Sequence, residues 1–431
     1  MNNNTRVPQL RFPEFKNSGE WKKKRFIDVA DKNVKWSFSG GPFGSDLKSS
    51  DYTNAGVRVI QLQNIGDGSF INKNVVYTSK NKADKLISCN IYPDEIILSK
   101  MGDPVGRASI IPNIHSRYLM CSDGIRLVVD KEHYNNYFIF SFINHPNFRK
   151  LIESSSTGST RKRIGLGILK KLPAVLPKEK LEQQKIADCL SSLDDLITAH
   201  TEKLDTLKDH KKGLMQNLFP TDGEKVPKFR FPEFKDSDEW ETIPFSKYII
   251  LYRGSSPRPI RDFITKEKTG VNWIKIGDTK YANNYIISQV VEKITTKGAE
   301  KSRKVSRGEL ILANSMSYGK TYLLDIEGCI YDGWFVLREY EKHFQKRFLL
   351  HILNSNFMQQ QYKKLSAGGI VQNISSEIVY QTILPFTSFD EQKKITDCLS
   401  TIDEQISAQA EKIATIKQHK KGLMQGLFPT N

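Results

Sequence analysis

Two segments of this chain occur twice, in the same order, and this duplication constrains the fold more than any other feature. The segment VPQLRFPEF at residues 7–15 returns as VPKFRFPEF at residues 226–234. A longer segment at residues 182–220 returns at residues 391–429, where 25 of the 39 aligned positions are identical. Repeats that keep their order in this way indicate copies of one structural unit. We therefore expect a tandem repeat of two half-molecules, which a pseudo-twofold axis can relate.

The stretches between the repeated segments, residues 22–177 and 241–385, have little sequence in common. Both nevertheless carry an Asp-Gly step before an apolar run, in SDGIRLVV from Ser122 and in YDGWFVLR from Tyr331. Short β-branched and aromatic runs, such as VRVIQLQNI from Val57, alternate in them with Gly-rich turns, a pattern typical of strands. These features predict one strand-rich, mixed α/β fold that carries two different surfaces.

The longer repeated segment has the apolar spacing of a coiled-coil helix. Apolar residues recur at alternating intervals of four and three, and polar residues interrupt this seam at His200 and Lys211, and again at Gln409 and Lys420. A Leu-Phe-Pro sequence ends each helix, because proline cannot continue one. The predicted seam residues are Ile186, Leu190, Leu193, Ile197, Leu204 and Leu207 in the first helix, and Ile395, Leu399, Ile402, Ile406, Ile413 and Ile416 in the second.

A single seam more often packs against its own domain, but two matching seams in one chain favour pairing with each other. A pseudo-twofold axis perpendicular to the helices makes this pair antiparallel, with one variable domain at each end; a parallel pair would place both domains at one end. The expected fold class is α+β, with two mixed α/β domains separated by two long helices that form an antiparallel coiled coil. The predicted parts are an N-terminal segment at 1–21 that repeats 220–240, a first domain at 22–178, a repeated helix at 179–220, a linker at 221–240, a second domain at 241–386 and a C-terminal repeated helix at 387–431.

Charge and composition narrow the classes of partner. The chain has 65 Lys and Arg residues against 48 Asp and Glu residues, a net charge of +17. Such a charge attracts nucleic acid through long-range attraction and counterion release, although a basic surface without a partner is an alternative. No apolar run approaches the ~20 residues that a membrane helix needs, and the N-terminus lacks the pattern of a secretory signal, so we expect a cytoplasmic protein. None of the five cysteines forms a C-x-x-C pair, which argues against structural zinc and disulfides.

The ordered duplication resembles the specificity (S) subunit of Type I restriction-modification enzymes over essentially the whole chain. The residues that carry the resemblance are the helix starts EQQKIADCLS and EQKKITDCLS, from Glu182 and Glu391, and the helix ends HKKGLMQNLFP and HKKGLMQGLFP. The turn PFGSDLKSSDY from Pro42 and the segment GSTRKRIGLGILKKLPAVLP from Gly158 also contribute to it. The second domain departs from this pattern, because its closing segment from Ser366 lacks an Arg-Lys-Arg cluster.

The resemblance implies a non-catalytic subunit that binds double-stranded DNA. Each variable stretch would be a target recognition domain that reads one half of a bipartite, asymmetric DNA target. The paired helices would set the gap between the halves and dock two methyltransferase (M) subunits, which carry S-adenosylmethionine and methylate adenine. Restriction (R) subunits with an ATP-driven, Mg-dependent activity would join them. The resemblance thus places S-adenosylmethionine, ATP and Mg in partner subunits, with no cofactor in this chain.

The sequence itself lacks the motifs of the corresponding catalytic chemistry. It has neither the Gly-rich cofactor loop nor the Asn/Asp-Pro-Pro-aromatic turn that an adenine methyltransferase needs. Gly319-Lys320-Thr321 resembles the end of a P-loop, but Asn314 stands where the first glycine of that loop should be. Asp94, Glu95 and Lys100 resemble a nuclease cluster, but Leu98 replaces the acid expected before the lysine. We therefore expect no catalytic residues and no metal site.

Side chains that fork onto base edges, and Gly-Ser-rich turns that bring amides to phosphate, identify candidate DNA contacts. The cluster at residues 161–163 lies in a Gly-Ser loop and is the strongest of them; for each other candidate, a solvated surface side chain is the alternative. The candidates in the first domain are Ser45, Lys48, Gln61, Gln63, Asn64, Arg107, Arg161, Lys162 and Arg163. Those in the second domain are Arg253, Ser255, Ser256, Arg258, Arg261, Lys275, Lys320 and Gln372.

Two other functions fit parts of this pattern. A stand-alone, sequence-specific DNA-binding regulator explains the charge, but a regulator's dimer normally reads a palindrome with identical domains. A purely structural coiled-coil scaffold explains the helices but not two large, diversified basic domains. Copurification with a methyltransferase subunit would distinguish the regulator from the specificity subunit.

Overall fold

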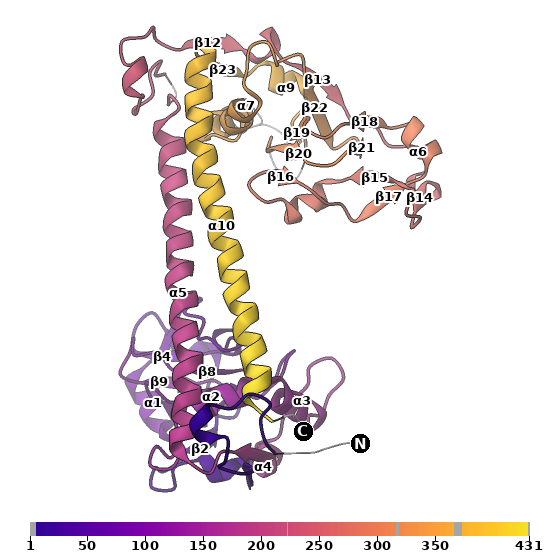
Figure 1. The fold of residues 1–431 in the computed structure, drawn as a ribbon. Helices are drawn as coiled ribbons and strands as arrows, with labels where there is room; N and C mark the ends of the chain where they lie inside the picture. The colour runs from indigo at the N-terminus through magenta and orange to yellow at the C-terminus, as the bar shows by residue number, and fades with distance from the viewer. Residues whose placement is uncertain (1–5, 222, 316–318, 366–372, 430–431) are drawn as a thin grey trace. The chain divides into compact units, whose positions relative to one another are not determined.

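A computed structural model describes residues 6–221, 223–315, 319–365 and 373–429 of the chain (Figure 1). The chain divides into two compact units. The first comprises Met1–His200 together with Lys412–Asn431, and the second comprises Thr201–Glu411. Each unit therefore contains one variable stretch and a part of both repeated helices.

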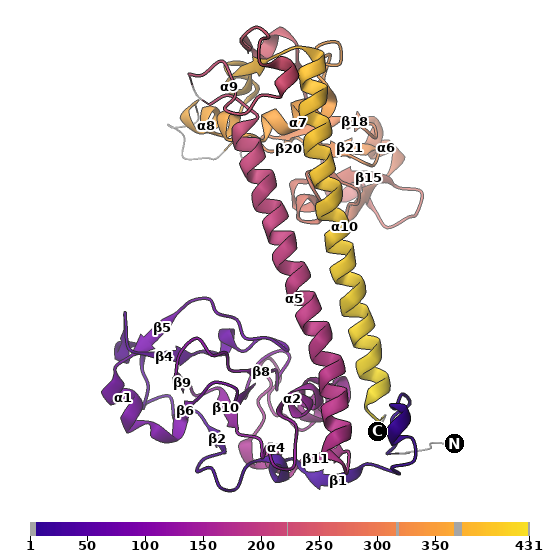
Figure 2. The same ribbon diagram turned by 60° about the vertical axis from the view of Figure 1, so that its left-hand side comes forward.

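The two long helices are α5, Lys180–Asn217, and α10, Phe389–Leu427. They lie side by side in the views of Figures 1 and 2. In the first unit, Asp194 of α5 forms an ion pair with Lys420 of α10 at 2.5 Å. In the second unit, Lys211 of α5 forms the same pair with Asp403 at 2.5 Å. These two pairs occupy equivalent positions of the repeat.

Apolar packing within each unit gives the direction of the pair. In the first unit, Leu190 of α5 and Leu427 of α10 lie in one core cluster. Seen from the ion pair, this cluster lies toward the start of α5 and toward the end of α10, so the two helices run in opposite directions. In the second unit, Leu218 shares a cluster with Ile395 in the corresponding way. The predicted antiparallel coiled coil is confirmed, and all twelve predicted seam residues are buried or partly buried. The ion pairs also explain why the seam has a lysine at two equivalent positions.

The first unit is built on two sheets and a short ribbon. One sheet has the order β2-β10-β7-β8, another has the order β3-β5-β4-β9-β6, and β1 pairs with β11. The strands are β1 (Lys22–Arg25), β2 (Phe38–Gly40), β3 (Tyr52–Thr53), β4 (Val57–Ile60), β5 (Val76–Thr78), β6 (Asn90–Ile91), β7 (Ile96–Ser99), β8 (Ala108–Ile110), β9 (Tyr118–Met120), β10 (Gly124–Leu127) and β11 (Pro173–Leu176). The short helices are α1 (Lys80–Lys85), α2 (Asn136–Asn144), α3 (Pro146–Ser154) and α4 (Leu166–Lys171).

The second unit repeats this plan, with one further strand. Its sheets have the orders β13-β22-β19-β20-β16 and β14-β17-β15-β21-β18, and β12 pairs with β23. The strands are β12 (Glu241–Pro244), β13 (Ile250–Arg253), β14 (Ile264–Thr265), β15 (Val271–Ile274), β16 (Ile286–Ile287), β17 (Glu292–Ile294), β18 (Arg303–Val305), β19 (Leu310–Ala313), β20 (Thr321–Leu324), β21 (Gly328–Ile330), β22 (Trp334–Arg338) and β23 (Ile383–Phe386). The helices are α6 (Thr296–Glu300), α7 (Lys346–Leu353), α8 (Asn356–Leu365) and α9 (Ser376–Tyr380).

Apolar residues hold the sheets and helices of each unit together. The main core of the first unit joins the β2-β10-β7-β8 sheet to α2, α3 and the ends of both long helices. Phe428, from the second Leu-Phe-Pro sequence, stacks on Phe138 of α2 with ring centroids 5.4 Å apart. Phe219, from the first such sequence, packs on Phe348 of α7 at 5.6 Å in the second unit. The repeated helix ends therefore anchor each helix in a core as well as terminating it.

The shorter repeated segment has a structural role of the same kind. Arg11 donates to Glu182 at the start of α5 with Nε to Oε1 at 2.8 Å, and Arg230 bonds Glu391 at the start of α10 at the same distance. The backbone N–H of Leu10 donates to the carbonyl of Gly426 at 2.8 Å. This contact ties the N-terminal segment to the last turn of α10. The repeat also predicts a circular arrangement, in which residue 431 lies near residue 1; both of these residues lie outside the described part of the chain.

Two further observations concern localisation and metal binding. Within the described part of the chain, no helix is long and apolar enough to cross a membrane. One group of potential metal ligands, Asp130, Glu132 and His133, lies in the described residues with its ligand atoms within 4.8 Å of one another. Asp130 bonds both of the other two, accepting from the Glu132 backbone at 3.0 Å and contacting His133 Nδ1 at 2.8 Å. These bonds account for the cluster as a turn.

Candidate nucleic-acid interface

A cavity of about 980 Å³ in the second unit gathers half of the candidate DNA contacts of that domain. Strands β15 and β21 are parallel, with Ile274 opposite Ile330, so the residues that follow them meet at one edge of the sheet. Lys275 and Tyr331 are those residues. The loop after β13 crosses them at Gly254, where a Cβ would lie 2.0 Å from the Tyr331 carbonyl oxygen. The polar and aromatic residues of the cavity wall are Ser256, Arg258, Arg261, Trp273, Lys275, Glu292, Tyr331 and Asp332.

The charged side chains of this cavity offer both hydrogen-bond donors and acceptors, as recognition of base edges requires. Asp332 accepts a hydrogen bond from Ser256. That bond, against the opposing effect of partial burial, holds the pKa of the Asp332 carboxyl below its usual value, with help from a backbone hydrogen bond and from the guanidinium groups of Arg258 and Arg253. The side chains of Arg258 and Arg261 are 83% and 87% exposed and can therefore reach a ligand. Arginine pairs well with guanine and a carboxylate accepts from the cytosine amino group, so the set suits a duplex edge.

The first unit has an equivalent edge with different residues. Strands β4 and β9 are parallel, with Ile60 opposite Met120, and they bring Gln61 and Cys121 side by side. The Gln61 backbone N–H donates to Asn64 Oδ1 at 2.9 Å, just as Lys275 N–H donates to Asp278 Oδ2 at 2.8 Å. Gln61 thus occupies the place of Lys275. Its side chain accepts from Gln63 Nε2 at 2.8 Å, which makes this edge an amide surface where the second unit has a cation.

The Arg-Lys-Arg cluster lies beside the same edge. Thr157 and Arg163 close its loop through two backbone hydrogen bonds of 2.9 and 2.8 Å. Gly158 has a φ of +101°, which a side chain would strain. Arg163 donates to Asp123 Oδ1 at 2.8 Å, in the loop that leads from β9 to β10. Lys162 pairs with Glu153 at 2.5 Å, and the exposed Arg161 forms no ion pair with the described residues.

Three further candidates in the first unit differ in their access to a ligand. Ser45 and Lys48 are exposed in the loop between β2 and β3, next to Phe43, which is 82% exposed. Asn64 is fully buried, and its amide donates to the carbonyls of Ile71 and Lys73 at 3.0 and 2.8 Å. Asn64 therefore holds a turn in this structure, and we no longer propose it as a direct DNA contact.

The remaining candidates are held by other parts of the protein. Arg253 Nε donates to the Asp332 carbonyl at 3.3 Å, and Ser255 donates to the Lys301 carbonyl at 3.4 Å, both near the cavity. Arg107 and Lys320 are partly buried and directly precede β8 and β20. Lys320 lines a second cavity, away from the set around Asp332. Gln372 lies outside the described residues.

Sequence reasoning missed the aromatic wall and its acidic partner. Trp273 and Tyr331 have ring centroids 6.5 Å apart in the second unit. Glu292 forms an ion pair with Lys275 across the cavity. One signal could have identified the neighbourhood, because Asp332 belongs to the Asp-Gly step shared by both variable stretches. Nothing in the local sequence indicated that β15 and β21 are neighbours.

Comparison with known proteins identifies the family. A model of the Type I restriction modification DNA specificity domain matches residues 19–209 and 251–418, which is most of the chain. The chain belongs to this family. The putative type I restriction enzyme MjaX specificity subunit of Methanocaldococcus jannaschii is 22% identical over 378 residues, covering 86% of this chain and 85% of that protein. The MjaVIII specificity subunit of the same organism is 24% identical over 262 residues, covering 58% and 60%.

Solved structures in this family have a similar fold. The Type-I restriction-modification system S subunit from M. genitalium has a TM-score of 0.57 at 14% identity, covering 99% of this chain and 100% of that one. A chain from structural work on complex assembly and conformational transition of the type I R-M system has a TM-score of 0.58 at 14% identity, covering 95% and 97%. The specificity-domain fold therefore extends over the whole described chain.

Proposed function

We propose that this chain is the DNA sequence-recognition subunit of a Type I restriction-modification complex. One observation carries the proposal: the two units share strand order and backbone contacts but present different side chains at the same sheet edge. Gln61 and Cys121 stand at this edge in the first unit, and Lys275 and Tyr331 stand there in the second. Two different readers on one framework suit a bipartite, asymmetric DNA target.

The contacts would divide into positioning and reading. Exposed cations such as Arg161 would neutralise phosphates, and the net charge of +17 favours this electrostatic attraction to DNA. Exposed side chains beside the sheet edges, such as Arg258 and Arg261, would contact bases. Neither task requires chemistry, so this subunit would be non-catalytic.

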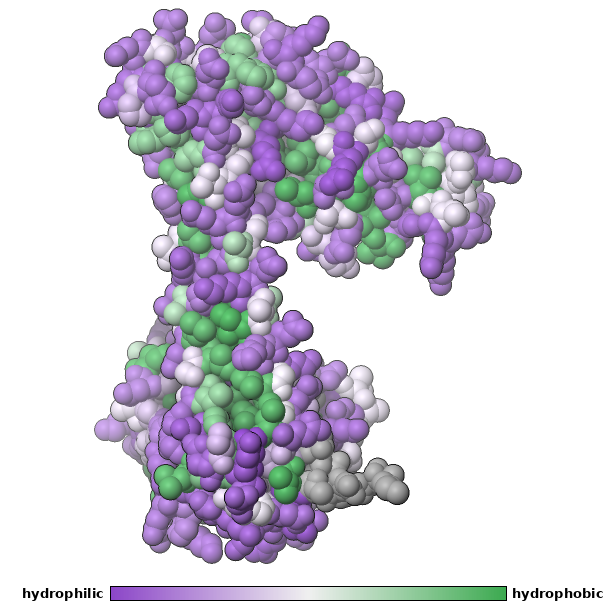
Figure 3. Space-filling view, in the orientation of Figure 1, coloured by the Kyte–Doolittle hydropathy of each residue, from purple (hydrophilic) through white to green (hydrophobic). Residues whose placement is uncertain are grey.

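The helices would set the gap between the two half-sites and dock the catalytic partners. Figure 3 shows hydrophobic residues gathered along the helix pair of the first unit. Among the residues of α5, Leu196 is 43% exposed. Leu181, in the first turn of α5, is 72% exposed. A hydrophobic patch like the one in Figure 3 is typical of protein interfaces. We propose two methyltransferase subunits as partners, with S-adenosylmethionine bound by them, and restriction subunits that use ATP and Mg.

A domain exchange tests this function. Replacing residues 22–178 with the same region of a relative should change one half of the methylated DNA motif and leave the other half unchanged. The matched exchange of residues 241–386 should change only the other half. Single-molecule sequencing of methylated adenines in cells that carry each chimera measures both. If one exchange altered both halves, the two-reader model would be wrong.

The stand-alone regulator remains the second candidate. Its argument is that specific DNA binding by this chain does not itself require a partner. Different readers in the two units count against it, because a regulator's two domains normally match. Purification of the chain from its own cells decides between them: a methyltransferase subunit that copurifies supports the specificity subunit, and DNA binding without one supports the regulator.

A further inference from the structure

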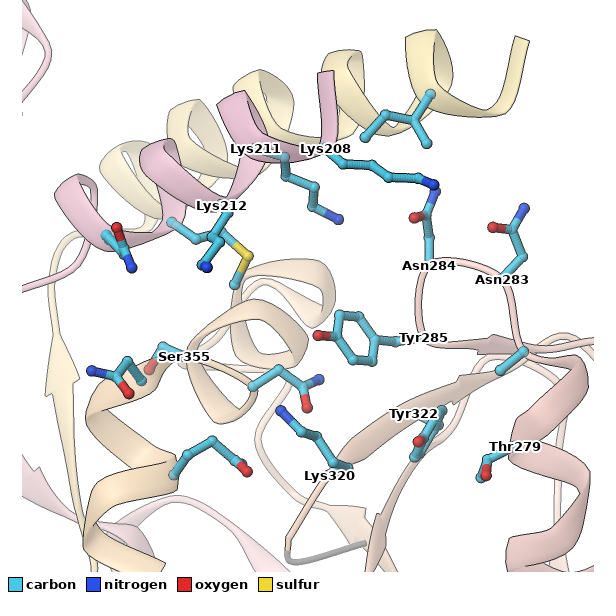
Figure 4. Close-up of a pocket in the computed structure, with 17 residues that line it drawn as sticks. Lys208, Lys211, Lys212, Thr279, Asn283, Asn284, Tyr285, Lys320, Tyr322 and Ser355 are labelled. Carbon is cyan, nitrogen blue, oxygen red and sulfur yellow. The ribbon is translucent and has the colours of Figure 1, made fainter. Parts of the chain in front are cut away.

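A second cavity, of about 890 Å³, lies wholly within the second unit, between α5 and the variable domain. Three lysines of α5 line one wall, namely Lys208, Lys211 and Lys212. Lys320, directly before β20, lines the opposite wall with Tyr285. Figure 4 shows Lys211 and Lys320 pointing into the same space, with the Tyr285 hydroxyl between them. The cavity wall contains no aspartate or glutamate among the described residues.

The internal carboxylates neutralise only part of this charge. Lys211 pairs with Asp403 at 2.5 Å, and Lys208 lies 3.9 Å from the exposed Asp205. Among the described residues, Lys212 and Lys320 have no ion-pair partner. Burial lowers the pKa of Lys320, and no neighbouring carboxylate opposes that effect. A half-buried ammonium without a counter-charge costs free energy that a bound anion would recover.

In the equivalent place of the first unit, a carboxylate pairs with one of two neighbouring cations. Arg107 corresponds to Lys320, because its carbonyl accepts from Ser99 N–H at 2.8 Å as that of Lys320 accepts from Ala313 at 2.9 Å. Its neighbour Arg149 pairs with Asp67 at 2.9 Å. In the second unit, an amide stands where Arg149 would be, at Gln359 of α8. The second unit has thus kept one of the two cations, at Lys320, and the described wall around it has no carboxylate.

We propose that this cavity binds a phosphate-bearing ligand. Converging lysines hold phosphate as point charges, and the surrounding asparagine and tyrosine side chains can donate to its oxygens. The same chemistry is offered by two sources, the backbone of bound DNA and the phosphates of a free nucleotide. The site is separate from the reading edge of the unit. The proposal of a phosphate site rests on the proposed function only if bound DNA supplies the phosphate.

The test compares a cavity variant with a matched surface variant of the full chain. The cavity variant carries Lys212→Met and Lys320→Met, and the control carries Lys342→Met at an exposed turn of the same unit. Calorimetric titration with inorganic pyrophosphate measures free phosphate binding. The dependence of DNA affinity on salt measures backbone contacts, since each lost phosphate contact reduces the logarithmic slope by about one. If Lys320→Met disturbs folding, Lys212→Met alone serves as the test, because the Lys212 side chain is exposed. It should change pyrophosphate affinity and the salt slope in the same direction, by a smaller amount.

Each outcome decides the proposal. A salt slope smaller by roughly one to two in the cavity variant, with the control unchanged, supports the site and assigns it to DNA. An unchanged slope with pyrophosphate affinity at least about tenfold weaker supports the site and assigns it to a free nucleotide. If neither quantity changes relative to the control, the cavity is not a phosphate site. A wild-type chain that binds pyrophosphate but no DNA would count against the proposed function and leave this site standing.

Discussion

Replacing Lys211 with methionine removes one charge of the ion pair that α5 and α10 form in the second unit. The side chains of Lys211 and Asp403 are only 10% and 12% exposed. The equivalent pair in the first unit is more open, with Lys420 at 20% and Asp194 at 35% exposure. Lys420→Met is therefore a control for the same substitution at the same position of the repeat.

The burial of each pair gives the expected magnitudes. Lys211→Met leaves the buried Asp403 carboxylate uncompensated, which costs ~3–5 kcal/mol of unfolding free energy. Lys420→Met should cost ~1 kcal/mol or less, because Asp194 keeps water and the hydrogen bond from Tyr137. Replacing both members by apolar residues, as Lys211→Met with Asp403→Leu, should recover most of the loss, with a coupling energy of ~2–4 kcal/mol.

Calorimetric unfolding of the full chain measures these differences. For a unit of this size, each kcal/mol shifts the melting temperature by ~2–4 °C, so Lys211→Met should lower that of the second unit by on the order of 10 °C. Wild type, Lys211→Met, Asp403→Leu and the double variant form a double-mutant cycle, with Lys420→Met as the external control. Equal losses from Lys211→Met and Lys420→Met, or a double variant as unstable as the sum of its single variants, would refute this account of the seam.

Three further predictions concern DNA contact, pH and topology. Because Phe43 is 82% exposed, Phe43→Ala should leave the unfolding free energy within ~0.5 kcal/mol of wild type, measured by thermal melting. It should weaken DNA binding roughly fivefold or more, measured by fluorescence anisotropy. An unchanged DNA affinity would show that this loop does not contact the DNA. Burial, followed by the charges of Lys211 and Arg347, lowers the pKa of His351 to about 3, below the unfolded value of ~6.5. The second unit should therefore lose ~2 kcal/mol of unfolding free energy as the pH falls from 6.5 to 5, because the unfolded chain takes up the proton first. Urea titrations should show that His351→Phe makes this loss smaller. A permutant that joins residue 431 to residue 1 and opens at residue 222 should fold and bind DNA, and a permutant that fails to fold would contradict the circular arrangement.

The long helices were predictable because their signal is local. The heptad spacing of the repeated segments needs no knowledge of the rest of the chain, and the second copy supplied the partner. The polar residues of the seam were visible in the sequence as interruptions. Their reason was not, because the carboxylates Asp194 and Asp403 that face Lys420 and Lys211 lie on the opposite helix.

The reading edge was only partly predictable for the opposite reason. Gln61 and Asn64 come from one short run, QLQN, and both have side chains suited to adenine. A turn of 3-10 helix at Leu62–Asn64 separates them, directing Asn64 into the protein and leaving Gln61 partly exposed. In the second unit, Tyr331 reaches Lys275 through a parallel strand pair that is distant in sequence. Residue type therefore identified candidates, and strand pairing decided which of them meet.

The contrast between the repeated and the variable segments follows from what each contacts. Lys211 of one helix faces Asp403 of the other, and Lys420 faces Asp194, so a change in either helix must suit a partner within the same chain. The same holds for the ion pairs of Arg11 with Glu182 and of Arg230 with Glu391, whose members must also suit each other. The side chains at the two sheet edges have partners within their own unit: Gln61 accepts from Gln63, and Lys275 pairs with Glu292. They can diverge independently on one framework, as a pair of readers for two different half-sites requires.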